Sequence, residues 1–276
     1  MVVVPLTGRV DPAGPLITLL TDFGCVDPYV AEMKGAILTI CPEARIVDVT
    51  HGVEKYDVGM GAFLLAEAAS FFPEGTVHVG VVDPGVGSSR RPMVVKARRG
   101  LFVGPDNGLL IPAAQTSGIV TVHEITNRFM MLPDVSSTFH GRDIFAPTAA
   151  HLACGHLPEE CGPEVNDYVK SPYHESVVEG KSAVCRVLHV DGFGNIVTNL
   201  TRADLNKLHL TENRKIILTL NGRRLTTKIT GTFSDLRKGE IGLILGSHGF
   251  YEIVCREANA GKRLRIKRGT VVRVSG

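Results

Sequence analysis

Hydrophobic and polar positions in the first half of the chain follow the pattern of an α/β domain. Short apolar runs of strand length alternate with longer stretches in which apolar residues recur every three or four positions. In the stretch 29–40, for example, Val30, Met33, Ile37 and Ile40 fall on one face, which predicts an amphipathic helix. The pattern predicts a largely parallel sheet with strands at 17–20, 45–50, 77–82, 93–96, 101–103 and 119–125, and helices at 29–40, 58–72 and 142–154.

The second half has a different pattern, in which β-branched runs are separated by turn residues. The pair Asn221 and Gly222 between two such runs predicts a tight hairpin. Between Gly155 and Gly180 the periodicity is lost and prolines accumulate, as in a linker between domains. We therefore expect an α/β domain over 16–168 and a smaller, mostly antiparallel β domain over 178–276, with strands at 183–190, 216–220, 225–229, 241–245, 251–255, 264–267 and 271–274.

Composition narrows the class of protein. With 276 residues, 44% of them hydrophobic, the chain is large enough for packed cores, and a net charge of +2 gives no sign of a nucleic-acid footprint. No apolar run approaches the ~18 residues of a membrane span, so we expect a soluble, cytoplasmic protein. The six cysteines, at 25, 41, 154, 161, 185 and 255, include no CxxC pair, which favours structural thiols over a redox or zinc site and predicts no metal.

Acidic residues follow two of the predicted strands, where open α/β sheets bind their ligands. Asp22 comes directly after the first strand, and two roles are open for it: binding the vicinal hydroxyls of a ribose, or capping a turn. Asp83 follows another apolar strand, with Gly85 and Gly87 allowing a sharp turn and Arg90 close behind. This segment is similar to a dinucleotide fingerprint, but the third glycine and the following helical pattern are missing.

His140 opens a predicted helix, where the N-terminus would keep its imidazole neutral. Taken alone, it fits a structural role as well as a catalytic one. Together with Asp83 and Arg90, however, it completes a carboxylate, a fixed cation and an imidazole, the groups needed to hold and deprotonate a water molecule at neutral pH. The three residues predict a hydrolytic or substitution enzyme.

A polar, glycine-containing turn interrupts apolar strand material in the second domain. Asp191 can pair with an ammonium group, Phe193 offers a face for stacking, and Asn195 can bind both a donor and an acceptor on a purine edge. Because hairpin loops are commonly rich in Asp, Gly and Asn, the turn by itself is a weak signal.

Seven segments in order resemble one family. They are TDFG (21–24), DVTHGV (48–53), VVDPGVGSSRR (81–91), VGPDNG (103–108), STFHGRDIFAP (137–147), VDGFGN (190–195) and GSHGFYEI (246–253). Together they resemble the S-adenosyl-L-methionine (SAM) hydroxide adenosyltransferases, which are related to the bacterial fluorinase and chlorinase. The resemblance runs from about Ile17 to the C-terminus.

The resemblance implies an activity and an assembly. Water or hydroxide attacks C5′ of the adenosyl group, and the products are adenosine and L-methionine; SAM is the substrate, and no cofactor is implied. The family also implies a homotrimer whose active sites lie between the N-terminal domain of one chain and the C-terminal domain of its neighbour. By motif match, the catalytic residues are Asp83, Arg90 and His140, and the substrate-binding residues are Asp22, Tyr56, Asn107, Asp191, Phe193, Asn195, Ser247 and Glu252.

Two alternatives remain open. Halogenases of this superfamily place aromatic residues at the positions of Asp83 and His140 and, in the fluorinase, a serine at Gly141, so the sequence favours hydrolysis over halogenation. A protein that only binds SAM or adenosine has no need for a water-activating group, so the same residues disfavour a binding protein. In the loop 255–262, Arg256 stands where the family pattern has an asparagine, which leaves adenine contacts from that loop unassigned.

Overall fold

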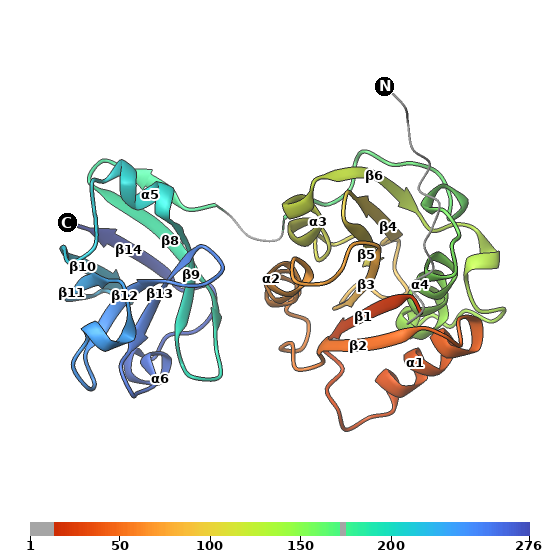
Figure 1. The fold of residues 1–276 in the computed structure, drawn as a ribbon, viewed down its shortest axis with the longest axis horizontal. Coiled ribbons are helices and arrows are strands. Elements are labelled where there is room, and N and C mark those ends of the chain that lie inside the picture. Colours follow the sequence, from red (N-terminus) through yellow and green to blue (C-terminus); the bar gives the residue numbers. More distant parts are fainter. Residues whose placement is uncertain (1–13, 172–174) are drawn as a thin grey trace. The chain divides into compact units, whose positions relative to one another are not determined.

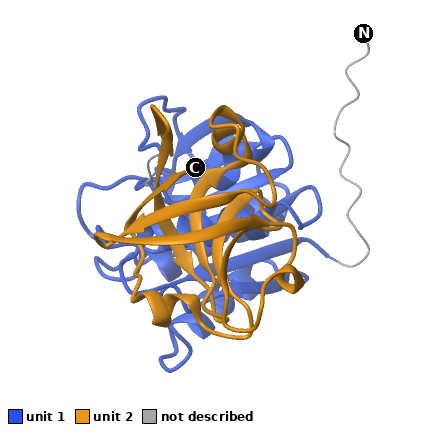
Figure 2. Ribbon diagram, turned by 90° about the vertical axis from the view of Figure 1, so that its left-hand side faces the viewer, with its two compact units in different colours: residues 1–172 blue, residues 173–276 orange. Residues whose placement is uncertain are grey.

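The computed structural model describes residues 14–171 and 175–276. The chain divides into two compact units, residues 1–172 and 173–276 (Figures 1 and 2). The first is an α/β unit with a mostly parallel sheet, and the second is a mostly antiparallel β unit. The predicted fold class is confirmed.

A six-stranded sheet forms the centre of the first unit. Its strand order is β2-β1-β3-β5-β4-β6; the first four strands in this order are parallel, and β4 runs antiparallel to both β5 and β6. The chain goes from β1 to β2 on one side and returns to β3 on the other, which creates the switch point where such sheets bind ligands. The strands are β1 (Leu16–Thr21), β2 (Arg45–Thr50), β3 (Thr76–Val81), β4 (Pro92–Ala97), β5 (Gly100–Pro105) and β6 (Ile119–Glu124).

The register at this switch point brings two acidic residues together. Thr21, the last residue of β1, pairs with Val81, the last residue of β3. Asp22 follows Thr21 directly, and Asp83 follows Val81 after one intervening residue. Both acidic residues therefore emerge from the same edge of the sheet. The predicted placement of both carboxylates at strand ends is confirmed.

Helices cover both faces of the sheet. Helices α1 (Tyr29–Ile40) and α4 (Ala146–Ala153) pack together, and α2 (Val58–Ala69) packs with α3 (Ile111–Ser117) (Figure 1). Short helical turns occur at Arg128–Met130 and Pro158–Glu160. Helix α3 was not predicted, because it is only seven residues long and is buried on its sheet-facing side without a clear polar face.

The predicted helix at 142–154 needs one correction. The segment Gly141–Phe145 is a π-helical turn, and the α-helix begins only at Ala146. Such π turns are rare and are found frequently at functional sites. Here the wide turn follows His140 directly.

Phe145 is the largest side chain that is fully buried in this unit. Its ring packs among residues of β1, β3 and α1, and the Arg90 guanidinium lies 5.3 Å from the ring centre. We expect Phe145→Ala to lower the free energy of unfolding by about 3–5 kcal/mol, because it leaves a large cavity in a packed core. Urea titration followed by circular dichroism measures this change, and Phe145→Leu should cost less than half as much; equal losses would contradict the packing argument.

The second unit is a closed β structure. Its strand order is β14-β10-β11-β12-β13-β9-β8-β7, and β14 also pairs with β8, which closes the sheet. Every pairing is antiparallel except β11 with β12. The elements are β7 (Val177–Glu179), β8 (Ser182–Val190), β9 (Ile196–Thr201), α5 (Arg202–Lys207), β10 (Lys215–Leu220), β11 (Arg223–Thr230), a turn at Phe233–Asp235, β12 (Ile241–Leu245), β13 (Phe250–Cys255), α6 (Ala260–Leu264) and β14 (Val271–Ser275).

Two local predictions in this unit have different outcomes. The hairpin at Asn221 and Gly222 is confirmed, since both residues have positive φ and join β10 to β11. The predicted strand at 264–267 is wrong, because α6 extends to Leu264 and the chain then turns at Arg265, which is left-handed, without forming a strand. The side chain of Asn259 accepts a hydrogen bond from the Lys262 amide at 2.7 Å, and this N-cap outweighs the alternating pattern that follows.

The cysteines and His78 have the features of structural residues. All six cysteines are free thiols, and four of them, Cys41, Cys161, Cys185 and Cys255, are buried. His78 is buried in β3, with Nδ1 2.8 Å from the Thr18 hydroxyl, and burial lowers the pKa of its imidazole to about 4.

Across the described residues, no helix combines the length and apolar character needed to cross a membrane.

Candidate active site

Asp83 and Arg90, from one turn, form a largely buried array with His140, which lies 50 residues further along the chain. The Arg90 guanidinium donates two hydrogen bonds to Asp83, from Nε to Oδ1 at 3.1 Å and from Nη2 to Oδ2 at 2.6 Å. Nη2 also lies 2.9 Å from Nδ1 of His140. The side chains of Arg90 and Asp83 are only 7% and 6% exposed, so the pair is well shielded from water. The predicted convergence of Asp83, Arg90 and His140 is present in this unit.

The glycine-containing turn explains how the array forms. Gly87 has a φ of 74°, and a Cβ placed there would lie 2.3 Å from the carbonyl oxygen of Ser137. The turn that precedes Arg90 therefore packs directly against the segment that precedes His140, an approach that only glycine allows. The Ser88 hydroxyl closes the turn by donating to the Gly85 carbonyl at 2.6 Å.

Burial and mutual charge change the acid–base properties of the array. Burial raises the pKa of Asp83 above its ordinary value, although the charge and hydrogen bonds of Arg90 act against this. Burial, followed by the positive charge of Arg90, lowers the pKa of His140. The two pKa values thus move toward one another, which keeps the imidazole neutral near pH 7 and makes the carboxylate a stronger base.

The array opens into a cavity of about 610 Å³ in the first unit. Asp83 and His140 line this cavity, whereas Arg90 reaches it only through these two side chains. Asp22 and Tyr56 also line it, as predicted for substrate-binding residues. Oδ2 of Asp22 accepts a hydrogen bond from the Tyr56 amide at 2.8 Å, which fixes one carboxylate oxygen.

Several residues of the cavity were not predicted. Phe23, Tyr29 and Phe139 form an edge-to-face aromatic cluster with ring centres 5.2–5.8 Å apart. Arg142 bonds to Glu32 at 2.7 Å and lies over the ring of Phe139. The positions of Phe23 and Phe139, each beside a candidate polar residue, are the only sequence signal for this wall of the cavity.

Asn107 is not among the residues that line the cavity. Its amide nitrogen donates to the Val82 carbonyl at 2.9 Å, and its side-chain oxygen accepts from the Leu109 amide at 3.1 Å. These bonds hold the chain beside Asp83 in place. In this arrangement Asn107 supports the turn, and its predicted contact with substrate stays a prediction.

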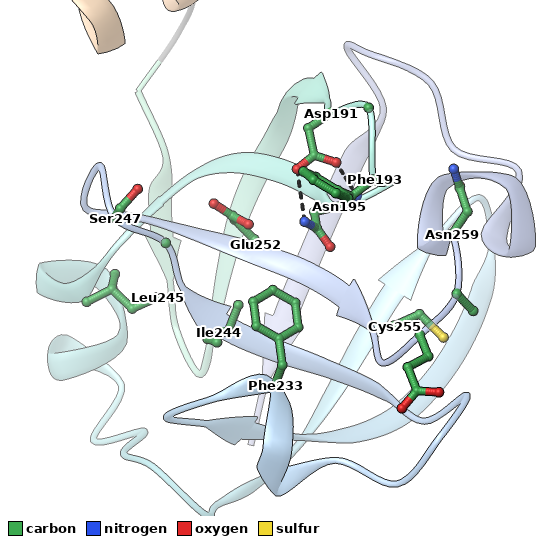
Figure 3. A pocket seen from close by; sticks show the side chains of 14 residues that line it. Asp191, Phe193, Asn195, Phe233, Ile244, Leu245, Ser247, Glu252, Cys255 and Asn259 are labelled. Carbon is green, nitrogen blue, oxygen red and sulfur yellow. Dashed lines mark hydrogen bonds between the residues drawn. The ribbon is translucent and has the colours of Figure 1, made fainter.

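The predicted binding residues of the second unit line a separate cavity of about 910 Å³. Figure 3 shows Asp191, Phe193 and Asn195 on the turn between β8 and β9, with Asp191 bonded to Asn195. Asp191 accepts bonds from the Asn195 amide and side chain at 2.8 and 2.9 Å. Phe193 is 85% exposed, so its ring is free to stack on a planar ligand.

Ser247 and Glu252 lie in the same cavity. Glu252 comes from β13, and a Cβ on Gly246 would collide with its carboxylate, so this glycine leaves room for the side chain. Burial, with a smaller contribution from the charge of Asp191, raises the pKa of Glu252. Two carboxylates in one cavity suit a ligand that carries a positive charge.

Several residues that line this cavity are not predicted from the sequence, among them Phe233 and Asn259. Phe233 lies in a short turn between strands, and Figure 3 shows its ring at the cavity. Asn259 belongs to the loop 255–262, for which the sequence assigns no adenine contacts. Its side chain packs closely against Gly194, where a Cβ would collide with it. The loop 255–262 therefore contributes Cys255, Glu257, Ala258 and Asn259 to the cavity.

The chemistry of the two cavities defines the class of protein. A buried carboxylate, guanidinium and imidazole beside a cavity are suited to activating a small nucleophile. A carboxylate at the switch point, an exposed aromatic face and an amide are suited to a nucleoside. Within the described residues, no group of three or more His, Cys, Asp or Glu side chains is arranged to hold a metal ion. These are features of a hydrolytic or substitution enzyme with a nucleoside-containing substrate.

Comparison with known proteins identifies the family. The SAM hydroxide adenosyltransferase N-terminal domain matches residues 17–162, and the corresponding C-terminal domain matches residues 185–273. The chain belongs to the SAM hydroxide adenosyltransferase family, and the resemblance seen in the sequence motifs is confirmed.

Individual relatives agree with this assignment. An (R)-S-adenosyl-L-methionine hydrolase of Salinispora tropica is 38% identical over 264 residues, which cover 95% of this chain and 98% of the relative. The crystal structure of an uncharacterized conserved protein from Thermotoga maritima is 35% identical, with a TM-score of 0.89, and the match covers 94% of this chain and all of that one. A fluorinase of an Actinoplanes species is more distant, at 28% identity over 292 residues, or 95% of this chain and 97% of the relative.

Proposed function

We propose that the protein hydrolyses SAM to adenosine and L-methionine. The observation that carries the proposal is the buried array of Asp83, Arg90 and His140 at the edge of a cavity that also contains Asp22. A nucleophilic water has a pKa near 15.7, so it needs a proton acceptor and electrostatic support to react at neutral pH. The array supplies both.

The hydrogen-bond directions in the array favour Asp83 as the proton acceptor. A guanidinium can only donate, so Nδ1 of His140 accepts from Arg90 and the neutral ring carries its proton on Nε2. The basic nitrogen of His140 is therefore occupied. Asp83 has further oxygen lone pairs and a pKa raised by burial, which suits it to take the proton from the attacking water.

The remaining residues suit the parts of SAM. Asp22 lines the first cavity and suits the ribose hydroxyls, and in the second cavity Phe193 suits stacking on adenine, Asn195 its polar edge, and Asp191 and Glu252 the methionine ammonium. As water attacks C5′, the carbon–sulfur bond breaks and methionine leaves as a neutral thioether. A poorly solvated cavity favours this loss of charge, and in-line placement of the water supplies part of the ~7–11 kcal/mol available from orientation.

The direct test is incubation of the purified protein with SAM in halide-free buffer, followed by chromatography of the products. We expect equal amounts of adenosine and methionine to form over hours, and to be lost in Arg90→Ala. Both sulfonium epimers are assayed separately. If neither epimer gives adenosine, while chloride or fluoride gives a 5′-halo product, the protein is a halogenase; bound but unchanged SAM would identify a binding protein.

We also propose a homotrimer in which each active site joins the first unit of one chain to the second unit of its neighbour. The proposal is supported by the family and by the division of the binding groups between two cavities, each within one unit. Two inactive variants, Arg90→Ala and Asp191→Ala, should regain activity when their subunits are mixed by refolding. Light scattering gives the mass of the assembly, and a monomer that is fully active would contradict the proposal.

The pKa shifts predict how the rate depends on pH. The proton acceptor must be unprotonated, so kcat is lost as the pH falls through the pKa of the array. Because burial raises the pKa of Asp83, the midpoint should lie above the ordinary carboxylate value of about 3.9. We expect kcat at saturating SAM to rise with pH through this midpoint and then to level off; a midpoint at or below the ordinary carboxylate value would contradict the assignment.

A further inference from the structure

A buried histidine beside the first cavity has no role in the mechanism above. His51 follows β2, the strand next to β1, and its side chain is 5% exposed. Nδ1 lies 2.8 Å from the hydroxyl of Thr21, the last residue of β1. His51 does not line the cavity, so any influence on the substrate must pass through its neighbours.

Its contacts form a polar chain that runs from the surface to the Asp22 loop. At the outer end, Lys34 bonds to Asp48 at 2.6 Å, and Oδ1 of Asp48 lies 3.1 Å from Nε2 of His51. A carboxylate near Nε2 favours the proton on that nitrogen, which leaves Nδ1 to accept a hydrogen bond from the Thr21 hydroxyl. The contact at Nε2 does not have hydrogen-bond geometry, so the hydrogen bond between Nδ1 and Thr21 is the contact that orients the ring.

At the inner end, the chain fixes the backbone on both sides of Asp22. The Thr21 oxygen, oriented by His51, accepts a hydrogen bond from the Phe23 amide at 3.1 Å. The carbonyl of His51 accepts from the Gly24 amide at 2.8 Å. Asp22 lies between Thr21 and Phe23, so the direction of its carboxylate depends on this short bridge.

We propose that His51 is a positioning residue for ribose recognition: through Thr21 it holds the Asp22 carboxylate in line with the two vicinal hydroxyls of the nucleoside. This inference rests on the proposed function, since it takes Asp22 as the ribose-binding residue. The ligand that Asp22 would recognise in this way is a nucleoside with both 2′- and 3′-hydroxyls.

Substitutions of His51 can test the contacts of its two ring nitrogens separately. In His51→Asn, the amide replaces Nδ1 and keeps the contact with Thr21, whereas in His51→Gln it replaces Nε2 and keeps only the contact with Asp48. Thr21→Val removes the hydroxyl at nearly constant shape, and it carries the test if the histidine variants do not fold. Calorimetry of the full-length protein measures the Kd for adenosine and for 2′-deoxyadenosine.

The unmodified protein should bind adenosine at least about tenfold more tightly than 2′-deoxyadenosine, because the deoxy ligand lacks one hydrogen bond to a charged group. We expect this ratio to fall to about twofold in His51→Gln and Thr21→Val, and to stay within twofold of its original value in His51→Asn. The KM for SAM should rise with the loss of selectivity, with a smaller change in kcat.

A second threonine–histidine contact, whose threonine lies in β1 as Thr21 does, serves as the control. Thr18 and His78 make the same 2.8 Å contact between a threonine hydroxyl and Nδ1, but they are not among the residues that line this cavity. Thr18→Val should lower the melting temperature without changing the ligand ratio. If Thr21→Val and His51→Gln behave in the same way, the contact is only structural and the inference is wrong. If the unmodified protein binds neither nucleoside, the proposed function itself fails, and the inference fails with it.

Discussion

Replacing Arg90 with alanine should lower kcat/KM for SAM hydrolysis by about 10³-fold. Arg90 makes every hydrogen bond that joins Asp83 to His140, and removal of a single preorganised electrostatic group costs about 10²–10³-fold in comparable sites. The variant also leaves Asp83 buried without its cation, which raises the pKa of the carboxyl further and weakens the carboxylate form that the reaction needs.

Steady-state kinetics, together with a melting curve, separate this effect from unfolding. The neighbouring Arg91 provides the control, because it pairs with Asp106 and Asp167 and contacts neither Asp83 nor His140. Arg91→Ala should change stability and reduce the rate less than tenfold. Retention of turnover in folded Arg90→Ala would count strongly against the proposed mechanism.

Asp83→Asn should reduce kcat by about 10²–10⁴-fold, the usual contribution of a positioned base. Asparagine has almost the same shape and still accepts a bond from Arg90, but its amide cannot take a proton from water. His140→Asn is the matched variant: its side-chain oxygen replaces Nδ1 as the acceptor for Arg90, so we expect it to keep kcat within about tenfold.

The relative size of the two losses in kcat identifies the residue that accepts the proton from water. A large loss in Asp83→Asn with a small loss in His140→Asn is the expected result, measured at saturating SAM and pH 7.5. The reverse order would make His140 the acceptor and would require the Arg90 contact with Nδ1 to break during the reaction. A discontinuous adenosine assay sensitive enough for slow turnover decides between them.

Periodicity predicted most of the fold because it reports local physics. The helix at Tyr29–Ile40 and the hairpin at Asn221 follow from which side chains face the core and which backbone angles a residue tolerates. Prediction failed where neighbours compete with the local pattern. At Ala260–Leu264 a helix capped by Asn259 takes up the start of an alternating segment, and at Gly141–Phe145 a π turn replaced regular helix.

The candidate site residues, like the fold, were predicted only in part from the sequence. The sequence by itself selected the candidate side chains, because Asp83, Arg90 and His140 are chemically unusual beside strand ends and glycines, and because ordered motifs indicate a family. Only the tertiary structure decided how they are arranged: the pairing of Thr21 with Val81 aligns the two carboxylates, and the close approach of Gly87 to Ser137 joins Arg90 to His140. Burial then shifts the pKa values and contact direction fixes the tautomer, and both depend on atoms that lie far apart in the chain.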